Sequence, residues 1–227
     1  MDFRQTTILD LTQQVQTGQT SCKALVTAAL QNIHRLNPVI NAFCAVDDAR
    51  ALDEAAKIDQ RLAAGEHLPL AGIPFGVKDL EDAQGYITTF GSAFHTEDAP
   101  ALEDSELVRR LRAAGAIVVG KTNPPEFGYK GKTDNVPFGV TKNPWDLTRT
   151  PGGSSGGSSA ALAAGMVPLA TGSDGGGSIR IPAALCGLSG IKTSQGRVPN
   201  GGPKPTGSGL LTVKGPMTRR IRDAAFV

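Results

Sequence analysis

The 227-residue chain has few cysteines, few aromatic residues and almost no net charge. Its three cysteines, Cys22, Cys44 and Cys186, are widely spaced and form no C-x-x-C pair, which argues against a disulfide framework and a zinc pattern. We interpret them as core thiols in a reducing compartment. The net charge of +2 and the aromatic content of 5% argue against direct binding to nucleic acid through charge or base stacking.

Long apolar runs are also missing. No run approaches the roughly 18 residues that a membrane span needs, and the first residues, MDFRQTTILDLTQQ, are too polar for a signal peptide. We therefore expect a cytoplasmic protein without membrane contact. No motif suggests a metal site or a cofactor, so we expect neither, and the sequence leaves a homo-oligomer open.

Helical and strand patterns alternate along the chain, which indicates an α/β layer fold. Helices are predicted within residues 8–18, 21–38, 47–65, 103–115 and 158–165. Buried strands are predicted within residues 40–46, 71–79, 116–123 and 166–174. The last segment, GPMTRRIRDAAFV, predicts a helix capped by Thr218 that stops without a closing glycine, which we interpret as a truncated reading frame.

Residues 115–122, GAIVVGKT, match the phosphate-loop pattern G-x-x-x-x-G-K-[ST]. The four residues between the glycines are apolar and largely β-branched, which is typical of the strand itself rather than of a loop. The following Asn123-Pro124-Pro125 blocks the helix that the pattern requires. We therefore do not expect nucleotide binding here.

Residues 152–156, GGSSG, match the hydrolase pattern G-x-S-x-G, in which a histidine follows the serine. All three histidines, His34, His67 and His95, precede it, so the base must be another residue. Lysine is the known substitute. Lys78 stands in the apolar segment AGIPFGVKD, and burial there would lower its pKa from about 10.4.

Three glycines, Gly175, Gly176 and Gly177, stand directly before Ser178 in the segment GSDGGGSIRIP. Glycine costs backbone entropy wherever the chain is ordered, so the run needs a physical reason. It is compatible with a flexible linker, with a phosphate loop, or with a loop whose N–H groups converge on an anion beside a nucleophile.

Five blocks together resemble the amidase signature family: AGIPFGVKD, GKTNPPEFG, NPWDLTRTPGGSSGGSSAALAAG, GSDGGGSIRIPAALCGLSGIKTSQGRVP and GPMTRRIRDAA. They occur in the family's order. The resemblance covers nearly the whole chain but only the front part of a family member. It implies a single α/β domain over residues 1–227, with a mixed β-sheet covered by helices, and acyl transfer run by a Ser–Ser–Lys triad on a small-molecule amide.

The resemblance also implies a role for each triad residue. Lys78 matches the family's lysine base, Ser154 its bridging serine after an unusual cis peptide, and Ser178 its nucleophile. The glycine run then becomes an oxyanion hole formed by the backbone N–H groups of Gly175, Gly176, Gly177 and Ser178. A helix that begins at Ser178 would add its dipole.

Further residues are expected to support this site. The resemblance implies that Ser155 is a hydrogen-bonding neighbour of the triad, and that Asp174 and Arg180 form an ion pair that fixes the loop. Segment TNPPEF, with Phe127 at its end, is expected near the active site. The sequence departs from the family at Gly175, where a larger residue is more common, so the hole is expected to be looser or deeper.

Three functions stay open at this point. The first is an amidase that releases ammonia or an amine from a carboxamide through an acyl-serine intermediate. The second is the glutaminase component of a tRNA-dependent amidotransferase, which needs partner subunits. The third is a fragment that folds incompletely and catalyses nothing.

Overall fold

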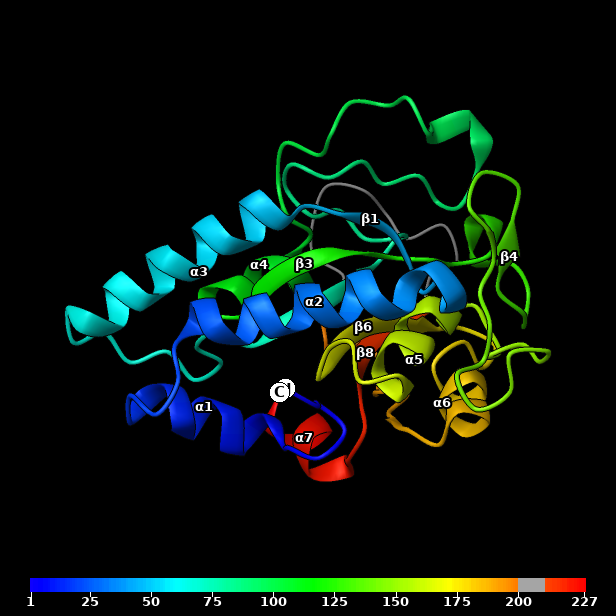
Figure 1. Ribbon diagram of the computed structural model, residues 1–227. Coiled ribbons are helices and arrows are strands. Elements are labelled where there is room, and N and C mark those ends of the chain that lie inside the picture. The colour runs from blue at the N-terminus through cyan, green and yellow to red at the C-terminus, as the bar shows by residue number, and fades with distance from the viewer. Residues whose placement is uncertain (200–210) are drawn as a thin grey trace.

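The computed structural model describes residues 1–199 and 211–227, and its centre is a mixed sheet of six strands in the order β1-β3-β2-β6-β8-β7 (Figure 1). β2 runs parallel to both β3 and β6, whereas β1 is antiparallel to β3, and β8 is antiparallel to β6 and β7. The strands are β1 (Phe43–Val46), β2 (Pro74–Lys78), β3 (Ile117–Thr122), β6 (Leu169–Asp174), β7 (Ser189–Gly190) and β8 (Val213–Thr218).

Seven α-helices of the described residues surround this sheet. They are α1 (Ile8–Gln16), α2 (Cys22–Ile40), α3 (Asp48–Ala63), α4 (Glu106–Ala113), α5 (Gly156–Ala163), α6 (Arg180–Cys186) and α7 (Ile221–Phe226). The longest, α2, crosses the front of the sheet in Figure 1. The turn-rich stretch between β3 and α5 contains a short hairpin of β4 (Asp134–Asn135) and β5 (Gly139–Val140).

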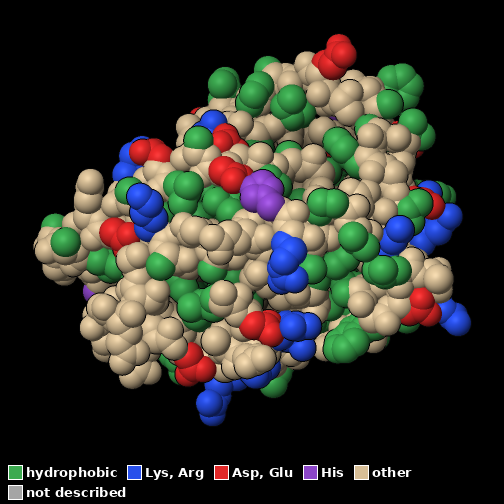
Figure 2. Space-filling view, viewed as in Figure 1, with side chains coloured by type: hydrophobic (Ala, Val, Ile, Leu, Met, Phe, Trp, Pro, Cys, Tyr) green, Lys and Arg blue, Asp and Glu red, His purple; other side chains and the backbone are tan. Residues whose placement is uncertain are grey.

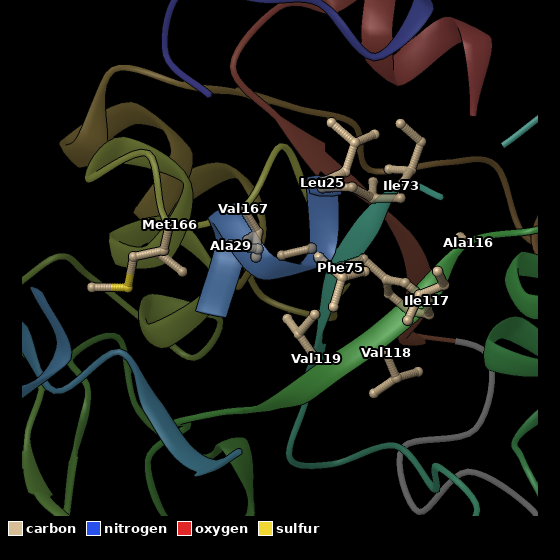
Figure 3. Packing of buried hydrophobic residues seen from close by; sticks show 14 of the residues in the cluster. Leu25, Ala29, Ile73, Phe75, Ala116, Ile117, Val118, Val119, Met166 and Val167 are labelled. Atoms are coloured by element: carbon tan, nitrogen blue, oxygen red, sulfur yellow. The ribbon is translucent and has the colours of Figure 1, made fainter. Parts of the chain in front are cut away.

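The hydrophobic core lies between the sheet and its helices. Figure 3 brings together Leu25 and Ala29 of α2, Phe75 of β2 and Val119 of β3, all of them buried. Every residue of β2 and β3 is buried, which is why the sequence of these strands is a continuous apolar run rather than an alternating pattern. A lysine carried on either strand is therefore forced into a dry environment.

Helix α2 extends further than its sequence pattern predicts. The Asn37-Pro38 pair was expected to end it, but it continues to Ile40, with Pro38 inside the last turn. Pro38 removes one amide donor. The side-chain oxygen of Asn37 binds the chain that follows by accepting from the amides of Ala42 and Phe43, at 2.7 and 2.8 Å.

The prediction of a helix from Thr218 is wrong at its start. Residues 213–218 form β8, which pairs with β6 on one side and β7 on the other. Thr218 is the buried last residue of this strand, and α7 begins only at Ile221. The carboxylate of Asp223 accepts from the amide of Ile8 at 2.9 Å, so α7 is tied to the first turn of α1.

Charged side chains are spread over the surface. Figure 2 shows lysine and arginine side chains interspersed with aspartate and glutamate on the face viewed, and hydrophobic side chains between them. This distribution agrees with a net charge of only +2. Among the residues that the structure describes, no helix has the length and hydrophobicity needed to cross a bilayer.

Candidate active site

Lys78 is the last residue of β2, and only 1% of it is exposed. Its ammonium group donates to three hydroxyl oxygens, those of Ser154 at 2.8 Å, Ser155 at 2.9 Å and Ser173 at 3.0 Å. The serines come from two places in the chain: the segment before α5 and the end of β6. The buried amine thus collects hydroxyls from residues far apart in sequence.

Burial lowers the pKa of Lys78 to about 7, while the carboxylates of Glu81 and Asp174 act in the opposite direction. At neutral pH the protonated and the neutral amine are therefore both well populated. A neutral amine can accept a proton from any of the hydroxyls around it. This is the property that a general base needs at physiological pH.

The peptide bond between Gly153 and Ser154 is cis, as the family resemblance implies. The backbone around it has no room for side chains. A Cβ on Gly153 would lie 2.8 Å from the carbonyl oxygen of Lys130, and the hydroxyl of buried Thr133 donates to the carbonyl of Gly152 at 2.9 Å. The glycines before Ser154 therefore let the chain pass closely between its neighbours.

The glycine loop follows β6 and is held by Asp174. The buried carboxylate of Asp174 accepts from the amides of Gly177 at 2.8 Å and of Ile179 and Arg180 at 3.2 Å each. The guanidinium of Arg180 adds two bonds, from Nε at 2.9 Å and Nη2 at 3.0 Å. Burial alone would raise the pKa of Asp174, but these bonds outweigh it and hold the pKa well below its usual range.

Two details differ from the sequence-based expectation for this loop. The amide of Gly177 is turned toward Asp174, so the amides of Gly175, Gly176 and Ser178 stay as candidates for an oxyanion hole. Helix α6 begins at Arg180 and not at Ser178. Both differences have one cause: the Asp174 carboxylate binds the amides that a helix from Ser178 would present.

Ser178 is half-buried beside the lysine cluster. Its carbonyl accepts from the amide of Ser155 at 3.1 Å, which joins the glycine loop to the segment that carries Ser154. No hydrogen bond links the Ser178 and Ser154 hydroxyls within the described part of the chain. Such bonds are often long without substrate and tighten when it binds.

The TNPPEF segment lies next to Ser154. A Cβ on Gly128 would be 3.2 Å from the Ser154 hydroxyl oxygen. The preceding residue, Phe127, is 56% exposed, and its ring lies 6.2 Å from that of Phe90 and 6.0 Å from that of His95. An exposed aromatic group thus borders the cluster.

Asn123, near the start of the same segment, is fully buried. Its side chain donates to the Thr141 hydroxyl at 3.1 Å and accepts from Asn135 at 2.6 Å. It therefore fixes the hairpin of β4 and β5. Glu126 accepts from the Ser92 hydroxyl at 2.8 Å.

Sequence reasoning missed Ser173 and the pair Glu81–Lys214. Ser173 is the third hydroxyl on the Lys78 amine. The carboxylate of Glu81 lies 2.5 Å from the Lys214 ammonium, and both side chains are largely buried. The position of Ser173 directly before Asp174 was the only available signal, since Lys214 meets Glu81 across 133 positions.

The rejected motifs stay apart from this cluster. Lys121, the lysine of the phosphate-loop pattern, is buried in β3 and paired with Asp79 at 2.7 Å. Two of the histidines, His34 and His67, are exposed, and His95 lies in the aromatic cluster near Phe127. No group of three or more His, Cys, Asp or Glu side chains that could hold a metal ion exists within residues 1–199 and 211–227.

The family described as Amidase matches residues 24–227. A Mycobacterium tuberculosis protein designated amidase AmiB2 is 49% identical over 210 residues, which are 92% of this chain and 45% of that protein. The chain belongs to the amidase signature family. Its α/β fold, with a mixed six-stranded sheet and surrounding helices, is accordingly shared with amidase signature enzymes of known structure.

Two further members of the amidase signature family resemble the chain closely. The glutamyl-tRNA(Gln) amidotransferase A-type chain of Roseiflexus castenholzii is 45% identical over 223 residues, which are 98% of this chain and 45% of that protein. A bacterial aryl acylamidase of known structure superimposes with a TM-score of 0.91 at 36% identity, over 97% of this chain and 46% of its own. The chain thus spans about half the length of these relatives.

Proposed function

We propose that the protein hydrolyses carboxamides through an acyl-serine intermediate on Ser178, with Ser154 as relay and Lys78 as general base. The observation that carries this proposal is the buried amine of Lys78, 2.8 Å from the Ser154 hydroxyl, in a cluster joined by backbone to Ser178. Membership of the amidase signature family supports it. A histidine base has no support, since none of the three histidines lies in the cluster.

Catalysis begins with neutral Lys78, which accepts the Ser154 hydroxyl proton while Ser154 takes the proton of Ser178. The Ser178 oxygen attacks the amide carbonyl carbon, and negative charge moves onto the carbonyl oxygen. The amides of Gly175, Gly176 and Ser178 stabilise that charge, which is usually the largest single catalytic contribution.

The second half returns the protons. The amide nitrogen takes a proton back through Ser154 as the C–N bond breaks, and the amine leaves. Water then attacks the acyl-serine ester, with the same relay accepting its proton. The acid is released and Ser178 regains its hydrogen.

Four residues support these steps without touching the reacting atoms. Ser155 and Ser173 fix the Lys78 amine by accepting from it on two further sides. The Asp174–Arg180 ion pair fixes the glycine loop against α6. No metal or cofactor enters the proposed reaction, and its substrate is a small-molecule amide.

A second candidate function is glutamine hydrolysis as the glutaminase component of a tRNA-dependent amidotransferase. The 45% identity to the Roseiflexus protein favours it. Glutamine and a simple aryl amide distinguish the two. Ammonia release from glutamine, strengthened by partner subunits, would favour the second function, whereas turnover of the aryl amide by the protein alone would favour the first.

A fluorophosphonate probe tests the nucleophile directly. We expect it to label the protein at Ser178, and we expect the Ser178→Ala variant to stay unlabelled. Labelling that persists in this variant would assign the nucleophile elsewhere. Cooperative unfolding without any labelling would favour the interpretation that the 227-residue chain alone catalyses nothing.

A further inference from the structure

The ammonium group of Lys192 binds the back of the glycine loop. It donates to the carbonyl oxygens of Asp174 at 2.7 Å, Gly175 at 3.2 Å and Leu211 at 3.2 Å. It also lies 3.6 Å from a carboxylate oxygen of Asp174. Lys192 comes from the segment after β7, so a separate part of the chain reaches the loop.

The geometry of the peptide unit gives these contacts a consequence. In a planar trans peptide the C=O of one residue and the N–H of the next point in opposite directions. A donor bound to the Asp174 carbonyl therefore fixes the direction of the Gly175 amide. In the same way, the bond to the Gly175 carbonyl fixes the Gly176 amide. One ammonium group thus orients two successive amides away from itself.

The loop has no side chains of its own to fix this orientation. Gly175 and Gly176 are exposed, and a Cβ on Gly176 would meet nothing within 4 Å. Asp174 holds the far end of the loop through the amide of Gly177, and Lys78 holds the near end through Ser173. Between those two anchors, the described contacts of the Gly175 and Gly176 peptides come from Lys192.

We propose that Lys192 is a positioning residue of the oxyanion hole, which orients the amides of Gly175 and Gly176 from behind. The inference rests on the proposed function, since it needs an oxyanion beside Ser178. A positive charge at the carbonyl end also polarises each peptide and strengthens its N–H as a donor. Lys192 does not touch the substrate in this role.

The test compares Lys192→Met and Lys192→Arg with the parent protein, and uses Lys23→Met as a control. Lys23 is exposed on α2, and its variant removes one charge without touching the loop. The readouts are the rate of fluorophosphonate labelling at Ser178, kcat and KM on an aryl amide, and the pH profile of both. Thermal unfolding reports whether each variant folds.

We expect Lys192→Met to lower the labelling rate and kcat by about 10- to 100-fold, since small displacements of catalytic groups have effects of this size. KM and the pH midpoint set by Lys78 should not change, which separates orientation of the oxyanion from damage to the base. Lys192→Arg keeps several donors and should recover most of the loss. If Lys192→Met does not fold, Lys192→Gln replaces it, with an intermediate loss expected because its amide is shorter and neutral.

The two proposals fail in different ways. A parent protein that labels at Ser178, together with Lys192 variants that label as fast as Lys23→Met, would overturn the role of Lys192 alone. A shifted pH midpoint in Lys192→Met would overturn it as well, because the effect would then run through Lys78. A folded parent protein that never labels would overturn the proposed function and the oxyanion role together.

Discussion

The Nζ atom of Lys78 lies 2.8 Å from the hydroxyl oxygen of Ser154, across 76 positions of sequence. A fully buried strand carries the amine to this point, and a glycine-rich segment brings the hydroxyl. Because burial brings the pKa of Lys78 to about 7, a proton can move between the two groups at neutral pH. Changes at Lys78 should therefore affect rate, pH dependence and stability in separate, measurable ways.

Replacement of Lys78 by alanine should lower the acylation rate by several orders of magnitude, since acid–base catalysis contributes about 10²–10⁴-fold. The parent's activity should rise with pH through about 7, as the amine loses its proton. Rates of aryl amide hydrolysis between pH 5 and 9, with Lys23→Ala as the control, measure both effects. A near-normal rate with an unchanged pH profile in Lys78→Ala would refute the base assignment.

The stability of the protein should also depend on pH through Lys78. The unfolded chain holds this proton up to about pH 10.4, whereas the folded protein releases it above about 7. The unfolded state therefore binds more protons between these values, and the free energy of unfolding should rise with pH, by up to about 1.4 kcal/mol per pH unit.

Lys78→Met removes this titration. Denaturant unfolding of parent and variant at several pH values between 7 and 10 gives the difference, in which other titrating groups cancel. The parent should gain on the variant steadily as the pH rises. A difference that stays flat over this range would mean that Lys78 keeps its ordinary pKa in the folded protein.

Much of this site could be predicted from sequence because its residues stand in quotable blocks. Lys78, Ser154 and Ser178 each occur within a contiguous motif, and the buried strands are recognisable as uninterrupted apolar runs. The positions of the helices follow from amphipathic spacing and caps such as Ser21, whose hydroxyl accepts from the amide of Ala24.

The missed features depend on contacts between distant segments. Neither the Glu81–Lys214 pair nor the Lys192 contacts with the glycine loop has a local signature. The start of α6 shifted for a similar reason: whether Asp174 binds its own loop amides is decided by tertiary packing and not by helix propensity. At Thr218, pairing of β8 with two neighbours overrode a plausible cap.

Replacement of Asp174 by asparagine should loosen the glycine loop. The variant loses the ion pair with Arg180, and its amide group cannot accept on both sides. We expect kcat to fall at least about 10-fold, since loop amides would be misplaced, while KM changes little. Asp2→Asn is the matched control, because Asp2 forms a comparable pair with Arg4 on the N-terminal segment.

The contribution of Asp174 to stability should vanish in acid. Its pKa is held well below the usual range, so its stabilisation is present above about pH 4, the unfolded value, and is lost as the pH falls further. The difference in unfolding free energy between parent and Asp174→Asn should therefore shrink between pH 5 and 2. A difference independent of pH would show that the charge of Asp174 does not stabilise the loop.

Glycine is required at position 177 for two separate reasons. Its φ of +126° lies in a region that other residues rarely adopt, and a Cβ there would lie 2.7 Å from the Cδ1 of Ile181. Gly177→Ala should therefore destabilise the protein and slow the labelling of Ser178. Gly131→Ala is the control, because a Cβ at Gly131 meets nothing within 4 Å and its φ is not positive. Thermal unfolding and fluorophosphonate labelling of both variants measure the effect. If Gly177→Ala labels as fast as Gly131→Ala, the backbone conformation at this position does not matter for acylation, and the loop amides are not held as we propose.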